Sequence, residues 1–404
     1  MAALDGLRVV DLTRYLSGPT ATMMLADLGA DVVKIETLPA GDAARQSGPF
    51  QDGESVYYMA SNRNKRSLAV DVRSDPGLRI VRELVDGADV FVQNFRPGTA
   101  QRMGLGPDEL LARNPRLIHV SISGFGSASP GADLPGFDQT AQAMSGLMSV
   151  TGTEATGPLR AGIAVADSAT GVFAVVGTLA ALHERDRTGR GGVVDSSLME
   201  SMLTLMSYQA QRYLTLGEIA PRVGNDHPIM FPQGTFAAQD GQLTLACGNE
   251  KMWHRLCRAL GVPELAAEPD YHDNAARMAN RARLREVLEE ILAARPVADW
   301  IKEINGAGVP CGPVLDLEQA LTHPVTDALR MVETVRHSRL GDLKVLGQGV
   351  KVHGSEQGWL RRHPPVLGEH TVEVLTEMNY SPEEIERILA GGFARQSTGS
   401  SGGA

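Results

Sequence analysis

The feature that most constrains the fold is a regular alternation of strand and helix signals over the first 130 residues. Short runs rich in valine, isoleucine and leucine are separated by stretches with helical apolar spacing. We predict strands over 7–13, 31–36, 66–72, 89–95 and 116–125, and helices over 18–30, 76–88 and around 107–113. Strands separated by amphipathic helices are typical of a parallel sheet with helices on its faces. The sequence therefore predicts an α/β fold.

The chain is long enough for more than one domain. The block 226–325 has its own hydrophobic periodicity, with a hairpin that turns at Asp240–Gly241, followed by four helical patterns. We expect a large domain with a Rossmann-like parallel sheet and a smaller α+β domain. The expected boundaries are 1–205 and 330–392 for the large domain, 226–325 for the small domain, 206–225 and 326–329 for linkers, and 393–404 for a Ser/Gly-rich disordered tail.

Composition and charge narrow the class of protein. The formal net charge of −10 disfavours a general binder of nucleic acid or of anionic membranes. The three cysteines, Cys247, Cys257 and Cys311, are too far apart and too few for a disulfide framework or a zinc cluster, so no metal site is expected. No charge-free run of 18 apolar residues occurs, so we expect no membrane-spanning helix and a cytoplasmic location.

Several common active-site motifs are missing. No GxGxxG pattern follows the first strand, which disfavours a nicotinamide-dependent dehydrogenase, and no Walker loop, GxSxG elbow or HExxH helix occurs. The first turn instead carries Gly18 and Pro19 at the start of a helix, where free backbone N–H groups can meet an anion. A plain strand-to-helix turn explains the same residues. One basic cluster stands out, formed by Arg63, Lys65 and Arg66.

Asp167 is unusual because it lies in AGIAVADSATGVFAVVG, a run that is otherwise free of charge. An unpaired carboxylate is costly to bury in such surroundings. The residue precedes a predicted helix, so it could simply cap that helix. The two interpretations are compatible, because a carboxylate at a helix N-terminus stays ionised and is then available as a nucleophile.

Several long strings, in order along the chain, resemble a known family. They include DLTRYLSGPTATMMLADLGADVVKIE, SNRNKRSLAVDV, QNFRPGTAQRMGL, PGFDQTAQAMSGLMSVTG and LRAGIAVADSATG. Together they resemble the class III coenzyme A transferases, also called the CaiB–BaiF or formyl-CoA transferase family, over about residues 5–392. The resemblance is greatest to members that act on dicarboxylates.

The resemblance implies a function and a catalytic residue. It implies transfer of CoA from a donor, succinyl-CoA or another short acyl-CoA, to a carboxylate acceptor, through an anhydride and then a CoA thioester on Asp167. CoA esters would be substrates, and no permanently bound cofactor is expected. The large domain would bind CoA, and two chains would form a homodimer interlocked like linked rings.

The family's CoA-contacting segments match a set of residues along the large domain: Leu16, Ser17, Val70, Asp71, Val72, Arg73, Asn94, Phe95, Arg96, Arg102, Phe137 and Asp138. Arg96 and Arg102 are the best candidates for pairing with phosphate, although arginines on a solvated helix face look the same in a sequence. Some members carry an arginine just after the second strand, where this chain has Thr37 and Leu38. Nucleotide contacts would then come from elsewhere, such as Arg45 or the basic cluster.

The residue at position 137 distinguishes CoA transfer from racemisation, two reactions of enzymes that this sequence resembles. The related 2-methylacyl-CoA racemases carry a histidine there as a base, and phenylalanine cannot take a proton. A racemase is therefore the second enzyme hypothesis, and a non-catalytic CoA-binding protein is a third, against which the intact Asp167 argues. Asp138 either lines the acyl site or caps the helix that follows it.

Overall fold

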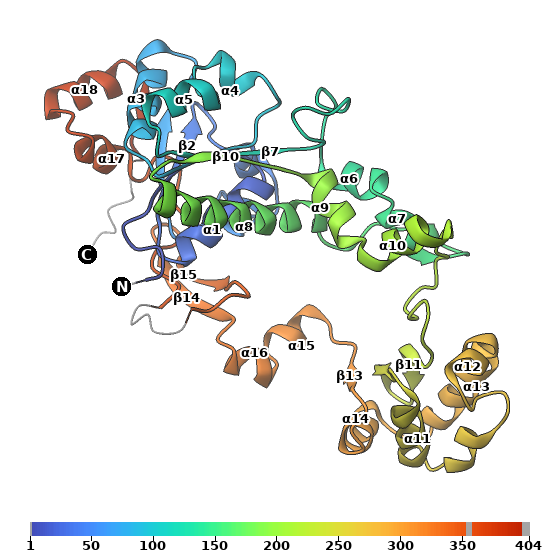
Figure 1. The fold of residues 1–404 in the computed structure, drawn as a ribbon. Helices are drawn as coiled ribbons and strands as arrows, with labels where there is room; N and C mark the ends of the chain where they lie inside the picture. The colour runs from blue at the N-terminus through green and yellow to red at the C-terminus, as the bar shows by residue number, and fades with distance from the viewer. Residues whose placement is uncertain (1, 353–357, 398–404) are drawn as a thin grey trace. The chain divides into compact units, whose positions relative to one another are not determined.

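A computed structural model describes residues 2–352 and 358–397. The chain divides into two compact units: the sheet unit, which comprises 1–146, 161–207 and 325–404, and the small unit, which comprises 147–160 and 208–324 (Figure 1). The domain boundaries expected from the sequence stay a prediction.

A seven-stranded sheet forms the centre of the sheet unit, in the order β10-β7-β6-β1-β2-β5-β16. Its strands are β1 (Arg8–Leu12), β2 (Asp31–Thr37), β5 (Lys65–Val70), β6 (Val90–Gln93), β7 (Ile118–Ser123), β10 (Gly192–Ser197) and β16 (Ala394–Arg395). All neighbouring pairs are parallel except β16 with β5. The predicted α/β class with a parallel sheet is confirmed.

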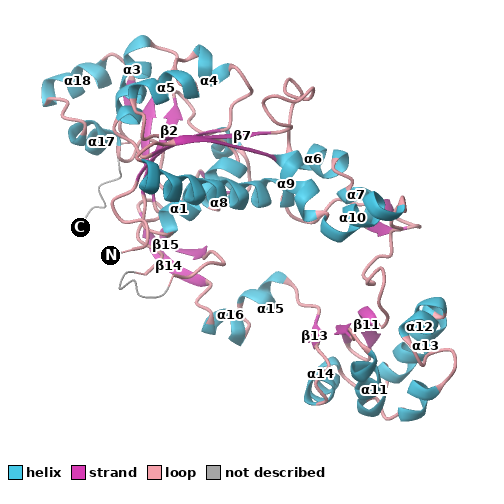
Figure 2. Cartoon of the chain, in the orientation of Figure 1, coloured by secondary structure: helices cyan, strands magenta, loops and turns pink. Residues whose placement is uncertain are grey.

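Helices cover both faces of this sheet (Figure 2). Val9, Val32 and Val90 pack in one core with α1 (Ser17–Asp27) and α8 (Val165–Thr188). The next residue on each strand points the other way, into a core with α3 (Asp75–Asp86), α5 (Pro107–Arg113), α17 (Thr371–Glu377) and α18 (Pro382–Ala390). Because side chains alternate along a strand and both faces are buried, consecutive apolar residues occur within β1, β2 and β6.

The remaining elements of the sheet unit are short. They are η1 (Ala43–Gln46), β3 (Phe50–Gln51), β4 (Glu54–Ser55), α2 (Val56–Met59), α4 (Thr99–Arg102), α6 (Asp138–Met144), α9 (Leu198–Leu205), β14 (Val332–His337) and β15 (Gly341–Leu346). Helix α16 (Pro324–Ala328) begins at the boundary between the units.

Close packing brings the second turn of α8 against the start of α1. A Cβ atom on Gly171 would lie 2.9 Å from the backbone oxygen of Ser17, and one on Gly18 would lie 2.4 Å from the Thr13 side chain. Only glycine fits at either place. Since Asp167 lies one helical turn before Gly171, this contact also puts Asp167 beside the loop after β1.

The opposite face of α8 is apolar and exposed, with Val176 58% accessible. Among the described residues, α8 is the one helix long and apolar enough to cross a membrane, which is weak evidence because core helices of soluble proteins pass the same test. Here α8 buries its small-residue face against α1 and the sheet.

The small unit combines a three-stranded antiparallel sheet with helices. The strands are β11 (Gln233–Ala238), β12 (Gly241–Ala246) and β13 (Cys311–Pro313). The other elements are α7 (Leu147–Val150), β8 (Gly152–Thr153), β9 (Gly157–Pro158), α10 (Ser207–Leu216), α11 (Glu250–Ala259), η2 (Pro263–Ala267), α12 (Asn274–Ala279), α13 (Arg281–Leu292), α14 (Val297–Gly306) and α15 (Leu317–Leu321). The hairpin is present, but its register pairs Ala238 with Gly241, so the turn is Gln239–Asp240, one residue earlier than predicted.

The C-terminal segment is ordered further than the sequence suggested. Ala394 is 3% exposed and pairs with Val70, and the amide of Asp71 donates to the Phe393 carbonyl at 2.8 Å. The prediction of a disordered tail from residue 393 is therefore wrong for 393–397, where strand pairing compensates the polar composition. Residues 398–404 lie outside the described part of the chain.

Candidate active site

A cavity of about 300 Å³ lies at the carboxyl ends of four parallel strands of the sheet unit. The loops after β1, β6 and β7 and the residue after β10 supply its walls, which is where ligands bind in open α/β sheets. The lining residues are Arg14, Tyr15, Ser17, Tyr57, Asn94, Phe95, Arg96, Pro97, Ile122, Ser123, Gly124, Ala132, Leu134, Pro135, Gly136, Phe137, Asp167 and Leu198.

Asp167 projects into this cavity from the first turn of α8. Burial and, to a lesser extent, the nearby charge of Asp138 raise its pKa, a hydrogen bond from the Ser17 side chain lowers it, and the net result is a pKa of about 6 against the ordinary 3.8. At neutral pH the carboxylate is therefore still ionised, but it is poorly solvated. These are the properties of an activated oxygen nucleophile.

Asp138 caps α8 rather than the helix on which it lies. Its Oδ1 accepts hydrogen bonds from the amides of Ala166, at 2.8 Å, and of Asp167, at 3.3 Å. Its Oδ2 accepts from Nε2 of Gln142 at 2.6 Å. The N-cap residue of α8, Ala164, has no side chain that could do this. Of the two roles expected for Asp138, a cap is present, but on a helix 28 residues along the chain.

A buried ionic network supports the loop after β1. Nζ of Lys34 donates to the Thr13 carbonyl at 2.9 Å and pairs with Asp42 at 2.9 Å. Oδ1 of Asp42 accepts from the amide of Tyr15 at 3.0 Å, which holds Tyr15 in a left-handed conformation with φ of 65°. Buried ion pairs therefore hold in place the loop after β1, which forms part of the cavity wall.

The basic cluster singled out in the sequence belongs to similar internal pairs. Arg63 pairs with Asp27, Lys65 pairs with Asp11 at 3.0 Å, and Arg66 pairs with Asp31. All three basic residues are buried. Arg45 pairs with Glu36 at 2.7 Å. These cations already neutralise carboxylates inside the protein, and the hypothesis that Arg45 or the cluster supplies nucleotide contacts stays a prediction.

The structure brings six predicted site residues together around the cavity: Ser17, Asn94, Phe95, Arg96, Phe137 and Asp167. Arg96 is exposed. The side-chain amide of Asn94 accepts from the backbone amide of Arg14 at 2.9 Å and donates to its carbonyl at 2.8 Å, so it ties the loops after β6 and β1 together.

The other predicted residues do not line the cavity. They are Leu16, Val70, Asp71, Val72, Arg73, Arg102 and Asp138. Val70 is fully buried, Arg73 pairs with Asp71 at 3.0 Å, and the exposed Arg102 donates to Oγ1 of Thr99 at 2.9 Å. Their contact with CoA stays a prediction.

Sequence reasoning missed two tyrosines and an arginine of the lining. Tyr57 lines the cavity together with Asp167, and burial and the charges of Asp167 and Asp138 raise the pKa of its phenol. Tyr15 meets Phe137 edge-to-face, with ring centroids 5.9 Å apart. Arg14 and Tyr15 directly follow the first strand, which was the available signal, whereas nothing in the sequence distinguished Tyr57.

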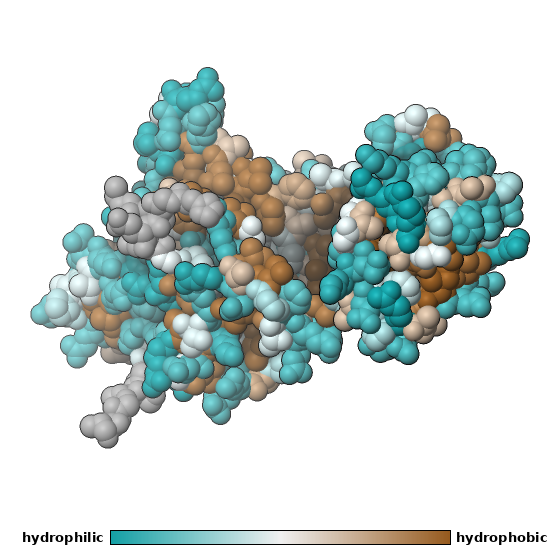
Figure 3. All heavy atoms as spheres, turned by 90° about the horizontal axis from the view of Figure 1, so that it is seen from below, coloured by the Kyte–Doolittle hydropathy of each residue, from teal (hydrophilic) through white to brown (hydrophobic). Residues whose placement is uncertain are grey.

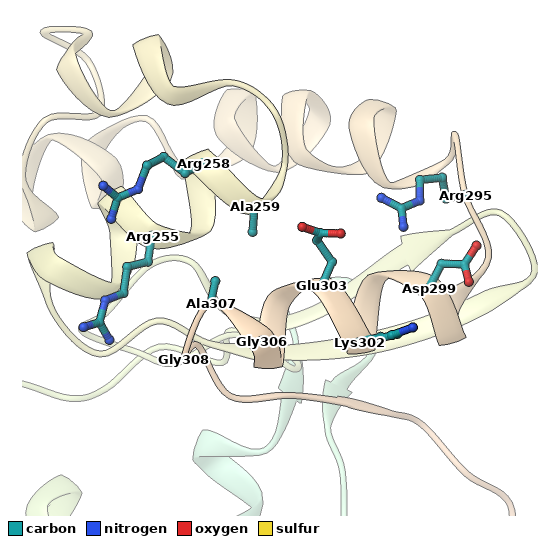
Figure 4. A pocket seen from close by; sticks show the side chains of 10 residues that line it. All are labelled: Arg255, Arg258, Ala259, Arg295, Asp299, Lys302, Glu303, Gly306, Ala307 and Gly308. Carbon is teal, nitrogen blue, oxygen red and sulfur yellow. The ribbon is translucent and has the colours of Figure 1, made fainter.

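A second cavity, of about 990 Å³, lies in the small unit between α11 and α14 (Figure 4). Its charged lining is mixed, with Arg255, Arg258, Arg295, Lys302, Asp299 and Glu303. None of the predicted site residues lies there. Among residues 2–352 and 358–397, no group of three or more His, Cys, Asp or Glu side chains could hold a metal ion.

The comparisons with known proteins agree with one another. A sequence model described as CoA-transferase family III matches residues 4–371. This chain belongs to that family. It is 38% identical to succinyl-CoA:glutarate CoA-transferase of Mus musculus, over 98% of this chain and 91% of the relative. It is 39% identical to acetyl-CoA:oxalate CoA-transferase of Acetobacter aceti, over 90% of this chain and 93% of the relative.

Solved structures of the family share the fold. A CAIB/BAIF family protein from Brucella suis superposes with a TM-score of 0.83 at 37% identity, covering 93% of this chain and 99% of that one. The resemblance predicted from the sequence is confirmed, as is the enzyme class. The protein is a class III CoA-transferase, which moves CoA between carboxylic acids.

Proposed function

We propose that this CoA-transferase takes CoA from a short acyl-CoA such as succinyl-CoA, passes it through a covalent intermediate on Asp167, and delivers it to a dicarboxylate. The observation that carries the mechanism is the state of Asp167, a poorly solvated carboxylate in the cavity with its pKa raised to about 6. Above that pH it is ionised and able to attack a thioester.

The proposed reaction balances without ATP or metal. The Asp167 carboxylate attacks the thioester carbonyl, the carbon–sulfur bond breaks, and CoA leaves as a thiolate, which leaves a mixed anhydride on Asp167. The thiolate then attacks the aspartyl carbonyl and releases the donor acid. The acceptor carboxylate attacks the resulting aspartyl-CoA thioester and releases CoA thiolate again. That thiolate attacks the acyl carbonyl of the new anhydride, which forms the new acyl-CoA and restores Asp167.

The positive charge of the cavity wall supports a dicarboxylate as the acceptor. Arg14 and Arg96 line the cavity, and both are exposed. A guanidinium binds a phosphate or a carboxylate in two-point fashion, so these residues suit the phosphates of CoA or the second carboxylate of a diacid. Two relatives are succinyl-CoA:glutarate CoA-transferase of Mus musculus and succinate–glutarate CoA-transferase of Agrobacterium fabrum, whose names point to the same acids.

Trapping tests the covalent step. Incubation with succinyl-CoA followed by hydroxylamine should convert Asp167 to a hydroxamate, a peptide about 15 Da heavier by mass spectrometry, because hydroxylamine intercepts an activated carboxyl. Asp167→Ala and Asp167→Asn should lose transfer. Asp186→Asn, at an exposed aspartate in the last turn of α8 and outside the cavity lining, is the matched control and should keep it. Turnover with an unlabelled Asp167 peptide would refute the mechanism.

A panel of acids resolves the substrates. Succinyl-CoA offered with mono- and dicarboxylates should give new thioesters with the dicarboxylates first. Preference for monocarboxylates would contradict the proposed acceptor. The racemase alternative has less support, because Phe137 contributes an aromatic wall to the cavity and no proton acceptor.

We also propose that the protein works as a cytoplasmic homodimer, without a nucleic-acid partner or a permanent cofactor. The support is an apolar surface on α8 and α9, where Val172, Val176, Leu203 and Leu205 are each at least 45% exposed. Hydrophobic side chains reach the surface in several places in Figure 3. Such a surface is costly to leave in water and suits a second copy of the chain.

A further inference from the structure

We propose that Asp138 is the positioning residue of this enzyme: its carboxylate, delivered from α6 to the first turn of α8, holds the backbone of Asp167 and so fixes the direction of its side chain. The inference rests on the proposed nucleophilic role of Asp167. This positioning role differs from the CoA-binding role that the family resemblance implies for Asp138.

The first step of the argument is geometric. One oxygen of Asp138 accepts from two consecutive amides, those of Ala166 and Asp167. The amide of the nucleophile itself is thus restrained, and with it the backbone from which its side chain extends. The first amides of a helix have no partner within the helix, and Ala164 offers none from its side chain. Asp138 supplies the hydrogen-bond acceptor for these amides that the N-cap residue of α8 lacks.

Asp138 is itself held rigidly. Gln142, one turn later on α6, is fully buried and donates to Oδ2 of Asp138 at 2.6 Å. The amide oxygen of Gln142 accepts from the amide of Ala161 at 2.8 Å. Both side chains of α6 therefore bind the segment that leads into α8. Because the Asp138 carboxylate is hydrogen-bonded to both α6 and α8, the position of α6 determines where the backbone of Asp167 lies.

The second step is electrostatic. The carboxylates of Asp138 and Asp167 both lie at the N-terminus of α8. The partial positive charge of the helix N-terminus offsets part of the repulsion between them. Asp138 is the charged group that raises the pKa of Asp167, while Ser17 lowers it. The other ionisable groups nearby are the phenols of Tyr57 and Tyr15, the buried Asp42, and Arg14 and Arg96 on the cavity wall. A more basic carboxylate that is still ionised is a better nucleophile, so the charge of Asp138 favours attack.

Three substitutions separate position from charge. Asp138→Asn keeps an oxygen for the two amides but removes the charge, so the acid limb of the kcat/KM profile should move to lower pH. Asp138→Glu keeps the charge and displaces the cap, so the limb should stay while kcat falls. Asp138→Ala loses both, and kcat should fall more than tenfold at pH 8, with a smaller change in the KM for succinyl-CoA.

Folding and mechanism are checked separately. In Asp138→Asn the new amide nitrogen would face Nε2 of Gln142, so each variant is first compared with wild type by thermal unfolding, and Asp186→Asn serves as the surface control. The rate of hydroxamate formation at Asp167 is then measured against pH. If wild type forms no hydroxamate at Asp167, the proposed function itself is refuted. Labelled wild type, with an unmoved acid limb in Asp138→Asn or with full kcat in Asp138→Ala, would overturn this inference alone.

Discussion

Replacing Asp167 by asparagine should make the folded protein more stable as well as inactive. The pKa of Asp167 is about 6 in the folded protein against 3.8 ordinarily. The folded state therefore holds the proton more tightly than the unfolded chain does, and ionised Asp167 opposes folding. A pKa difference of this size corresponds to about 3 kcal/mol. This cost is absent when both states are protonated, below pH 3.8, and is complete above pH 6.

The measurement compares the unfolding free energies of wild type and Asp167→Asn in urea at two pH values. Linkage predicts a gain of about 3 kcal/mol at pH 8 and roughly half of that at pH 5, where folded Asp167 is already mostly protonated. Asparagine keeps the size of the side chain and can still accept the Ser17 hydrogen bond. Asp186→Asn should change neither value, because Asp186 is exposed.

The pH dependence is the decisive result. A gain of equal size at pH 5 and pH 8 would show that packing rather than charge is responsible. A loss of stability at pH 8 would show that ionised Asp167 is well solvated or paired in the folded protein, and the reasoning about its reactivity would fail with it.

Two further predictions concern binding and assembly. Arg102→Ala should raise the KM for acyl-CoA by an amount worth about 1.5–3 kcal/mol, with little change in kcat, since a phosphate contact far from the thioester acts equally on ground and transition states; an unchanged KM with a collapsed kcat would reject that role. The purified chain should keep the mass of a dimer at nanomolar concentration in light scattering or mass photometry, because interlocked chains cannot part without unfolding, and a monomer under these conditions would exclude the linked-ring arrangement.

The fold was largely predictable because its signals are local. Strands buried on both faces are read directly from runs such as RVVDL and DVVKIET. The helix predicted around 107–113 has those same bounds in the structure. Asp167 could be found for a related reason, since a single charge in an apolar run is visible without knowing any contact.

The electrostatics of the site could not be predicted in the same way. Lys65 and Asp11 are 54 residues apart, and Arg66 and Glu373 are 307 apart. A sequence shows that such residues carry charge but not that the charges meet inside the protein, so a buried network looked like a surface for phosphate. The cap that Asp138 provides to α8 was hidden for the same reason, because it joins two helices.

The short strand β16 determines where the chain can be cut or extended. Ala394 and Arg395 cover one edge of β5, which would otherwise present unpaired backbone groups. A truncated form for crystallisation that ends before Phe393 would uncover this edge and invite chains to associate through it. A form that ends at Ser397, or an affinity tag placed after it, leaves the pairing intact. The last few residues before the tail are thus part of the sheet, although their composition resembles that of a linker.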